Sequence, residues 1–183
     1  AIVGGIVLLF NVAGGSLHAV IGILTAVIER QRSGLGQYID ISMTDCVVGL
    51  NNMAAAAVLA GSQKQYAEKE HLNGGTFYDY FKTLDGRYLS IGSLEPQFMA
   101  GLSTTLELPI IMEKGASFDP EDRLVVKQAI QAKIASQSFA DWSAIFAKLD
   151  YCVEPVLSLD EALYSDIAKQ RGWVVDVPVP NSN

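Results

Sequence analysis

Residues 13–45 read AGGSLHAVIGILTAVIERQRSGLGQYIDISMTD, and this stretch decides the fold class. Its centre, residues 17–32, is apolar on almost every side until Glu29, which predicts a central, buried helix. Ser16 is placed to cap the start of that helix. The glycine-rich residues 33–36 are typical of a helix C-terminus and predict its end.

The rest of the stretch predicts a layer of strand and helix. Residues 37–42 (QYIDIS) alternate and are rich in β-formers, so we predict a strand. The alanine-rich residues 43–60 predict a second helix, with Asp45 in its first turn. Upstream, the apolar residues 2–10 are too short to span a bilayer and fit a buried strand. A helix–strand–helix order favours an α/β fold.

Further along, the pattern changes to that of a mixed α and β domain. The further predicted elements are a hairpin of 77–82 and 88–92 with an Asp85-Gly86 turn, helices at 95–106, 120–136, 139–149 and 160–171, and strands at 153–157 and 173–177. We therefore predict a first domain over 1–60, a linker over 61–73 and a second domain over 74–183.

Composition and charge exclude several classes of protein. Half of the 183 residues are hydrophobic and the net charge is -7, which favours a packed globular protein and disfavours nucleic acid as a partner. The uncharged residues 1–28 are long enough for a membrane helix, but their glycines favour a buried strand and helix, so we expect no membrane partner.

Cysteines and histidines are few. Cys46 and Cys152 lie far apart, so we expect reduced thiols that pack as small buried hydrophobes, in the cytoplasm. His18 on its apolar helix is expected to be a packed or hydrogen-bonded residue, and His71 a solvated one. No metal site is expected.

Four stretches, in this order and spacing, carry a family resemblance. They are 13–45, GGTFYDYFKTLDGRYLSIGSLEPQF at 74–98, the segment 141–163 with CVEPVLSLDEAL, and Arg171-Gly172. Together they resemble the family III (CaiB/BaiF) CoA-transferase family, and most of all its α-methylacyl-CoA racemase branch.

The resemblance implies the fold and the partners. It implies an α/β fold in which the remnant of a large Rossmann-like domain precedes a mixed α+β small domain, with the front of the large domain truncated. It also implies an interlocked homodimer, a CoA thioester as substrate and no tightly bound cofactor. Neither histidine here lies in the GHD-type motif that holds the family's catalytic histidine.

The resemblance also assigns site residues. The family's catalytic aspartate precedes a glycine-rich turn, and the matching residue here is Asn11, whose amide is neither a base nor a nucleophile. Glu95 matches the glutamate of an EP motif that reaches the partner's active site, and Tyr78 matches a tyrosine of the same pocket. Gly14 and Gly15 would open a helix N-terminus that meets an anionic group of CoA.

Taken without the family, the same residues have simpler interpretations. Asn11 is then a turn residue, Glu95 a solvated residue at a helix start, and Tyr78 a half-buried strand aromatic. Gly14 and Gly15 are then small residues that allow tight packing.

Three functions remain open at this point. The first is an active racemase-like isomerase of 2-methylacyl-CoA thioesters. The second is a truncated relative that lacks turnover on its own and self-associates to bury the surface its lost part covered. The third is a small-molecule binding module that uses the pocket near Tyr78 and Glu95. We favour the second for the chain by itself.

Overall fold

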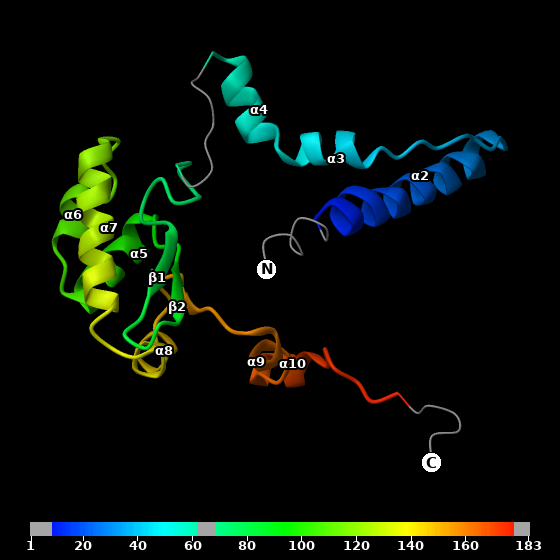
Figure 1. The fold of residues 1–183 in the computed structure, drawn as a ribbon. Helices are drawn as coiled ribbons and strands as arrows, with labels where there is room; N and C mark the ends of the chain where they lie inside the picture. Colours follow the sequence, from blue (N-terminus) through cyan, green and yellow to red (C-terminus); the bar gives the residue numbers. More distant parts are fainter. Residues whose placement is uncertain (1–8, 62–68, 178–183) are drawn as a thin grey trace. The chain divides into compact units, whose positions relative to one another are not determined.

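A computed structural model describes residues 9–61 and 69–177 (Figure 1). The chain divides into two compact units, residues 1–65 and 66–183. The domain bounds predicted from the sequence, with a linker at 61–73, stay a prediction.

The first unit is helical. It contains the π-helix η1 (Leu9–Leu17), followed without a break by α2 (His18–Ser33), then α3 (Met43–Leu50) and α4 (Asn52–Leu59). Helix α2 ends at Gly34, whose φ of 73° is the left-handed conformation that glycine adopts without strain. The predicted end of this helix is therefore confirmed, and so is Asp45 in the first turn of α3.

Several predictions for the first unit are wrong. Residues 37–42 are extended but form no strand with any described residue; they run beside α2, where a Cβ on Gly22 would lie 3.1 Å from the side chains of Ile39 and Ile41. Ser16 does not cap α2, because η1 already supplies a helical turn there. The helix predicted over 43–60 breaks at Asn51.

Helix α2 is not the buried helix that its composition predicts. None of its residues is buried, and six of its large apolar side chains are 38–60% exposed: Val20, Ile21, Ile23, Leu24, Val27 and Ile28. An apolar helix is buried only where other elements cover it, and the contacts of α2 in the described part of this unit are with η1 and with the segment before α3.

By length and composition, the helical run Asn11–Ser33 would also suffice to cross a membrane, with 6% of its most apolar window buried. This is weak evidence, because core helices and N-terminal signal sequences have the same composition.

The second unit is built on a three-stranded antiparallel sheet. Strands β1 (Asp79–Lys82), β2 (Tyr88–Ile91) and β3 (Val153–Pro155) follow one another in that order across the sheet. In register, Phe81 faces Leu89. The hairpin is therefore as predicted, including a turn in which Gly86 has a φ of 83°.

Helices cover one face of this sheet. They are α5 (Pro96–Leu106), α6 (Ile110–Lys114), α7 (Pro120–Ile134) and α8 (Phe139–Phe146), and α9 (Leu159–Leu163) and α10 (Asp166–Arg171) follow β3 (Figure 1). Alternate strand residues point toward the helices and are buried, which is the period-two pattern of a one-faced sheet. Helix α6 is absent from the prediction, the helix predicted over 160–171 breaks at Tyr164, and residues 173–177 form no strand.

The core lies between the sheet and these helices. It contains Phe77, Phe81, Leu89, Ile91, Met99, Leu102, Leu106, Ile111, Val126, Ile130, Ile134, Phe139, Trp142, Phe146 and Val153. The Trp142 indole N–H donates to the Ile134 carbonyl at 2.8 Å, so the largest core side chain also satisfies its polar atom.

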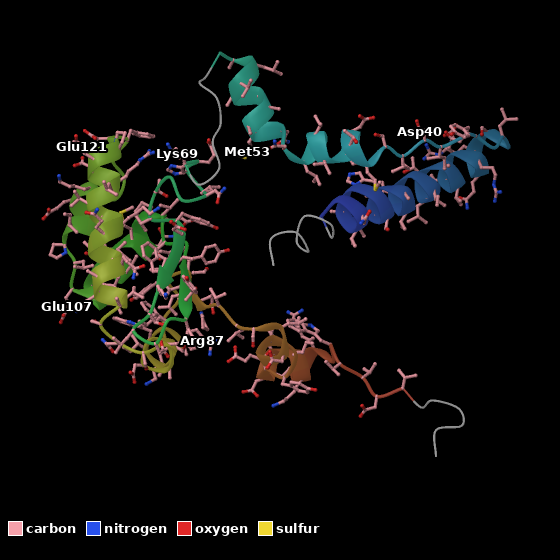
Figure 2. All side chains as sticks on the ribbon, in the orientation of Figure 1. Asp40, Met53, Lys69, Arg87, Glu107 and Glu121 are labelled. Carbon is pink, nitrogen blue, oxygen red and sulfur yellow. The ribbon has the colours of Figure 1, made fainter. Side chains whose placement is uncertain are left out.

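Two pairs of residues make side-chain hydrogen bonds at the edges of the second unit. The Gln131 amide donates to the Lys82 carbonyl at 2.8 Å and accepts from the Lys82 N–H at 3.0 Å, so a side chain takes the place of a further strand beside β1. Arg87, which Figure 2 labels, donates to both carboxylate oxygens of Glu161 at 2.8 and 2.6 Å, and this pair links α9 to the hairpin. This pairing, with bonds from Ser158, lowers the pKa of Glu161 from 4.5 to about 2.

Candidate functional site

Glu95 stands where the sheet meets the first helix that covers it. It is the N-cap residue of α5, and Pro96 occupies the first helical position, where its missing N–H is not needed. The Glu95 carbonyl accepts from the Met99 N–H at 2.8 Å, but its side chain makes no capping bond and is exposed. The carboxylate is therefore held at a fixed point of the backbone while its oxygens face solvent.

The turn that carries Glu95 is fastened to the segment before β3. The buried Ser93 hydroxyl donates to the Tyr151 carbonyl, and the Gly92 N–H donates to the Cys152 carbonyl at 2.8 Å. The Leu94 N–H donates back to the Gly92 carbonyl at 2.9 Å. These bonds make residues 92–95 and 151–152 one rigid block, here named the Glu95 block.

Gly101 on α5 has no side chain, and the ring of Tyr151 packs into the space that this leaves. A Cβ on Gly101 would lie 2.4 Å from the ring of Tyr151, closer than atoms of real side chains approach. The ring of Tyr151 therefore lies directly on the α5 backbone, and only glycine at position 101 leaves room for it.

Tyr78 lies against the same block. Its ring lies beside Gly92, where an added Cβ would be 3.1 Å from it. Its N–H donates to the Thr76 hydroxyl at 3.1 Å, its carbonyl accepts from the Gly74 N–H at 3.2 Å, and its side chain is 39% exposed. The structure thus brings Tyr78 and the turn that carries Glu95 together, as members of one surface.

A small cavity lies beside Tyr78 on the open face of the sheet. Its volume is about 170 Å³, and Tyr80 and Ser90, which face each other across β1 and β2, contribute to its wall. There is room for a small group rather than for a whole coenzyme.

Cys152 is a member of the Glu95 block that the sequence did not single out as part of a site. It is exposed, which corrects the expectation of a small buried hydrophobe, and its φ of 55° is rare for a residue other than glycine. The pKa of its thiol is raised, first by partial desolvation and then by the carboxylates of Glu95, Asp150 and Glu154. Asp150 and Glu154 are near Cys152 because they flank it in the sequence, whereas Glu95 is brought near the thiol by the fold.

The other predicted site residues belong to the first unit. Asn11 is exposed in η1, and its carbonyl accepts from the Ser16 hydroxyl at 3.2 Å. Gly14 is buried and Gly15 half-buried, and both lie inside η1, which corrects the expectation that they open a helix N-terminus. His18 donates from Nδ1 to the Ala13 carbonyl at 2.6 Å, so its ring links the start of α2 to η1.

Among the described residues, no three His, Cys, Asp or Glu side chains gather as they would around a metal ion.

Comparison with known proteins identifies the family. The model of CoA-transferase family III matches residues 6–183. The chain belongs to this family. It is 36% identical to alpha-methylacyl-CoA racemase of Mus musculus over 165 residues, which cover 90% of this chain and 43% of that protein. It is 32% identical to alpha-methylacyl-CoA racemase of Homo sapiens, with the same two coverages of 90% and 43%.

This family III chain also resembles a transferase and a solved structure. It is 26% identical to succinyl-CoA:glutarate CoA-transferase of Mus musculus, over 90% of this chain and 38% of that protein. The crystal structure of Rv3272 from M. tuberculosis, orthorhombic form, matches with a TM-score of 0.68 at 18% identity, over 95% of this chain and 48% of that one. This structural likeness confirms the α/β fold class. The chain spans less than half the length of each of these proteins.

Proposed function

We propose that this chain is the part of an α-methylacyl-CoA racemase-type protein that carries the Glu95 block, and that its substrates are 2-methylacyl-CoA thioesters. We propose further that the 183 residues by themselves self-associate and do not turn the thioester over. The observation that carries the substrate class is the 36% identity to an alpha-methylacyl-CoA racemase over 90% of the chain.

The chemistry supports the absence of turnover. Racemisation next to a thioester needs two groups that exchange a proton on opposite faces of an enolate. Asn11 stands where the family resemblance expects an aspartate, and an amide takes up no proton near neutral pH. His18 lies at the junction of η1 and α2 and not in a histidine motif of the family's type, and its Nδ1 donates to the Ala13 carbonyl. Glu95 is an exposed carboxylate in a fixed place, but it is one group where the reaction needs two.

The transferase alternative meets the same obstacle. Transfer of CoA between acids proceeds through a carboxylate nucleophile that forms an acyl anhydride, and an asparagine at position 11 forms none. The hypothesis of a binding module at Tyr78 and Glu95 is supported by the cavity of about 170 Å³ beside Tyr78, which holds a small group and no more.

Exposed apolar surface supports self-association. The six large apolar side chains of α2 are exposed, and further along the same unit Met53 is 78% and Leu59 is 88% exposed. Large exposed apolar side chains in such number are unfavourable in water and are commonly covered by a partner, of which a second copy is the simplest. We therefore expect a homodimer or a larger oligomer, assembled through the first unit.

A single exchange experiment tests the catalytic part. A chiral 2-methylacyl-CoA is incubated with the chain in deuterated water, and loss of the α-proton signal is followed by NMR, with Asn11→Asp measured in parallel. We expect no exchange by the unaltered chain. Exchange above the buffer rate that Glu95→Gln abolishes would contradict the proposal and make Glu95 a working base.

Sedimentation velocity tests the self-association. We expect a species larger than the 19.7 kDa of one chain, and a shift toward the monomer when Ile21 and Leu24 are both replaced by Glu. The matched control is the same pair of substitutions at Leu157 and Leu159, which are 41% and 76% exposed in the second unit. A monomer at micromolar concentration, or an equal effect of the control pair, would refute assembly through α2.

A further inference from the structure

A second cavity in the second unit lies between the start of α7 and the chain just before β1. Its volume is about 540 Å³. Lys69, Arg123 and Lys127 line it, with Pro120, Leu124 and the backbone of Gly74 and Gly75 as the remaining wall (Figure 2 labels Lys69 and, on α7, Glu121). It shares no residue with the Glu95 block, and Gly74 is the residue that it shares with the cavity beside Tyr78.

The charged residues that line this cavity are basic, whereas the chain as a whole is acidic. The chain carries 20 acidic and 13 basic residues, yet three of the basic residues and no acidic one line this cavity. Asp79, which is not part of the lining, pairs with Lys127, so the charge of Arg123 is the one that an anion in the cavity would chiefly meet. The cavity therefore has the electrostatic character of an anion site.

The two cations on α7 are already held in place. Lys127 Nζ lies 2.6 Å from the Asp79 carboxylate and donates to the Gly74 carbonyl at 2.6 Å, which leaves one of its three protons for a ligand. Arg123 Nε donates to the Ser117 carbonyl at 2.8 Å. Because their side chains are ordered before a ligand arrives, little conformational entropy is lost on binding.

Arg123 offers the geometry that phosphate needs. Within the described residues its two terminal Nη groups make no hydrogen bond, so the outer side of the guanidinium is available as a fork of donors. A guanidinium fork matches two oxygens of a phosphate, and the remaining N–H of the Lys127 ammonium adds a further charge-assisted donor.

We propose that this cavity binds a small molecule bearing a phosphate monoester or a diphosphate, with Arg123 as the bidentate ligand and Lys127 as the second cation. Leu124, which is 55% exposed, and Pro120 contact the organic part of that molecule. The apolar part of the wall fits this assignment, since an inorganic anion alone would leave Leu124 and Pro120 without a contact. The site is independent of the thioester chemistry proposed for the Glu95 block.

Isothermal titration calorimetry of the 183-residue chain with inorganic pyrophosphate and with adenosine 3′,5′-bisphosphate tests the site. Two variants remove it in different ways. Arg123→Gln deletes the fork, and Leu124→Glu keeps all three cations but places a carboxylate in the wall at an exposed position, so folding is preserved. The matched control, Lys148→Gln, removes one exposed cation far along the chain, at the end of α8.

The expected result is saturable binding of both probes, tighter for the adenosine compound, with affinity that falls as salt is added. Each of the two site variants should weaken binding about tenfold or more, the usual effect of losing a charge-assisted bond. The control should bind as the unaltered chain does. No saturable binding, unchanged affinity in Arg123→Gln, or an equal loss in Lys148→Gln would overturn the site. Equal affinity for the two probes would overturn the role of Leu124 and Pro120. None of these results depends on α-proton exchange, so this site and the proposed function fail separately.

Discussion

Replacing Gly101 with alanine tests how the Glu95 block is built. In the structure, three ring atoms of Tyr151 lie 2.4, 2.5 and 2.5 Å from the place that the new Cβ would take. The ring has to move, although its own carbonyl is held by Ser93. Overpacking of this kind costs about 1–3 kcal/mol. Alanine regains about 0.5–1 kcal/mol over glycine inside a helix. We therefore expect a net loss of about 0–2.5 kcal/mol, centred near 1 kcal/mol, in the free energy of unfolding.

Urea unfolding followed by tryptophan fluorescence measures this loss, because Trp142 is 1% exposed and becomes hydrated on unfolding. A thermal melt should show a fall in Tm of about 4 °C for each kcal/mol in a unit of this size.

The control is a double-mutant cycle. In a Tyr151→Ala background the clash is gone, so Gly101→Ala should there stabilise the protein by about 0.5–1 kcal/mol. If Gly101→Ala changes stability equally in both backgrounds, or stabilises the unaltered chain, the ring does not lie on the α5 backbone and the account of the block is wrong.

Two further predictions concern ionisable groups. The pKa of Glu161 is lowered to about 2 by its pairing with Arg87, so the stability this contributes is present above its ordinary pKa of 4.5 and is lost as the pH falls toward 2. Between pH 5 and 2 the Tm of Glu161→Gln should fall less than that of the unaltered chain, and parallel profiles would contradict this. The raised pKa of Cys152 predicts slow alkylation by iodoacetamide at pH 8 in a Cys46→Ala background, and Glu95→Gln should speed it. An unchanged alkylation rate in Glu95→Gln would show that the Glu95 carboxylate does not raise the pKa of the Cys152 thiol.

The secondary structure of the second unit could be predicted closely from local sequence patterns. The 77–92 hairpin was predictable because its turn contains an Asp-Gly pair and its strands alternate, so each signal lies within a few residues. The start of α5 was predictable from Pro96 for the same reason. Where prediction failed in this unit, as at 173–177, an extended composition was present but no strand of the described chain pairs with it.

The first unit shows the opposite case. The composition of α2 indicates a buried helix, but burial is a property of what surrounds a helix, and its apolar side chains are exposed here. Residues 37–42 likewise have the composition of a strand, but no strand in the described ranges 9–61 and 69–177 shares hydrogen bonds with them.

The sequence by itself determined the family, the α/β class and the positions of most helices and strands of the second unit, because these depend on local periodicity, turn residues and motif order. Only the tertiary structure decided which of these residues lie side by side. Glu95 and Cys152 are brought into one block, with Tyr78 against it, through bonds between residues about 60 positions apart, such as that from Ser93 to Tyr151. The cationic cavity likewise joins Lys69 to Arg123 and Lys127 across more than 50 residues. Such contacts depend on how the chain packs, and no spacing along the sequence encodes them.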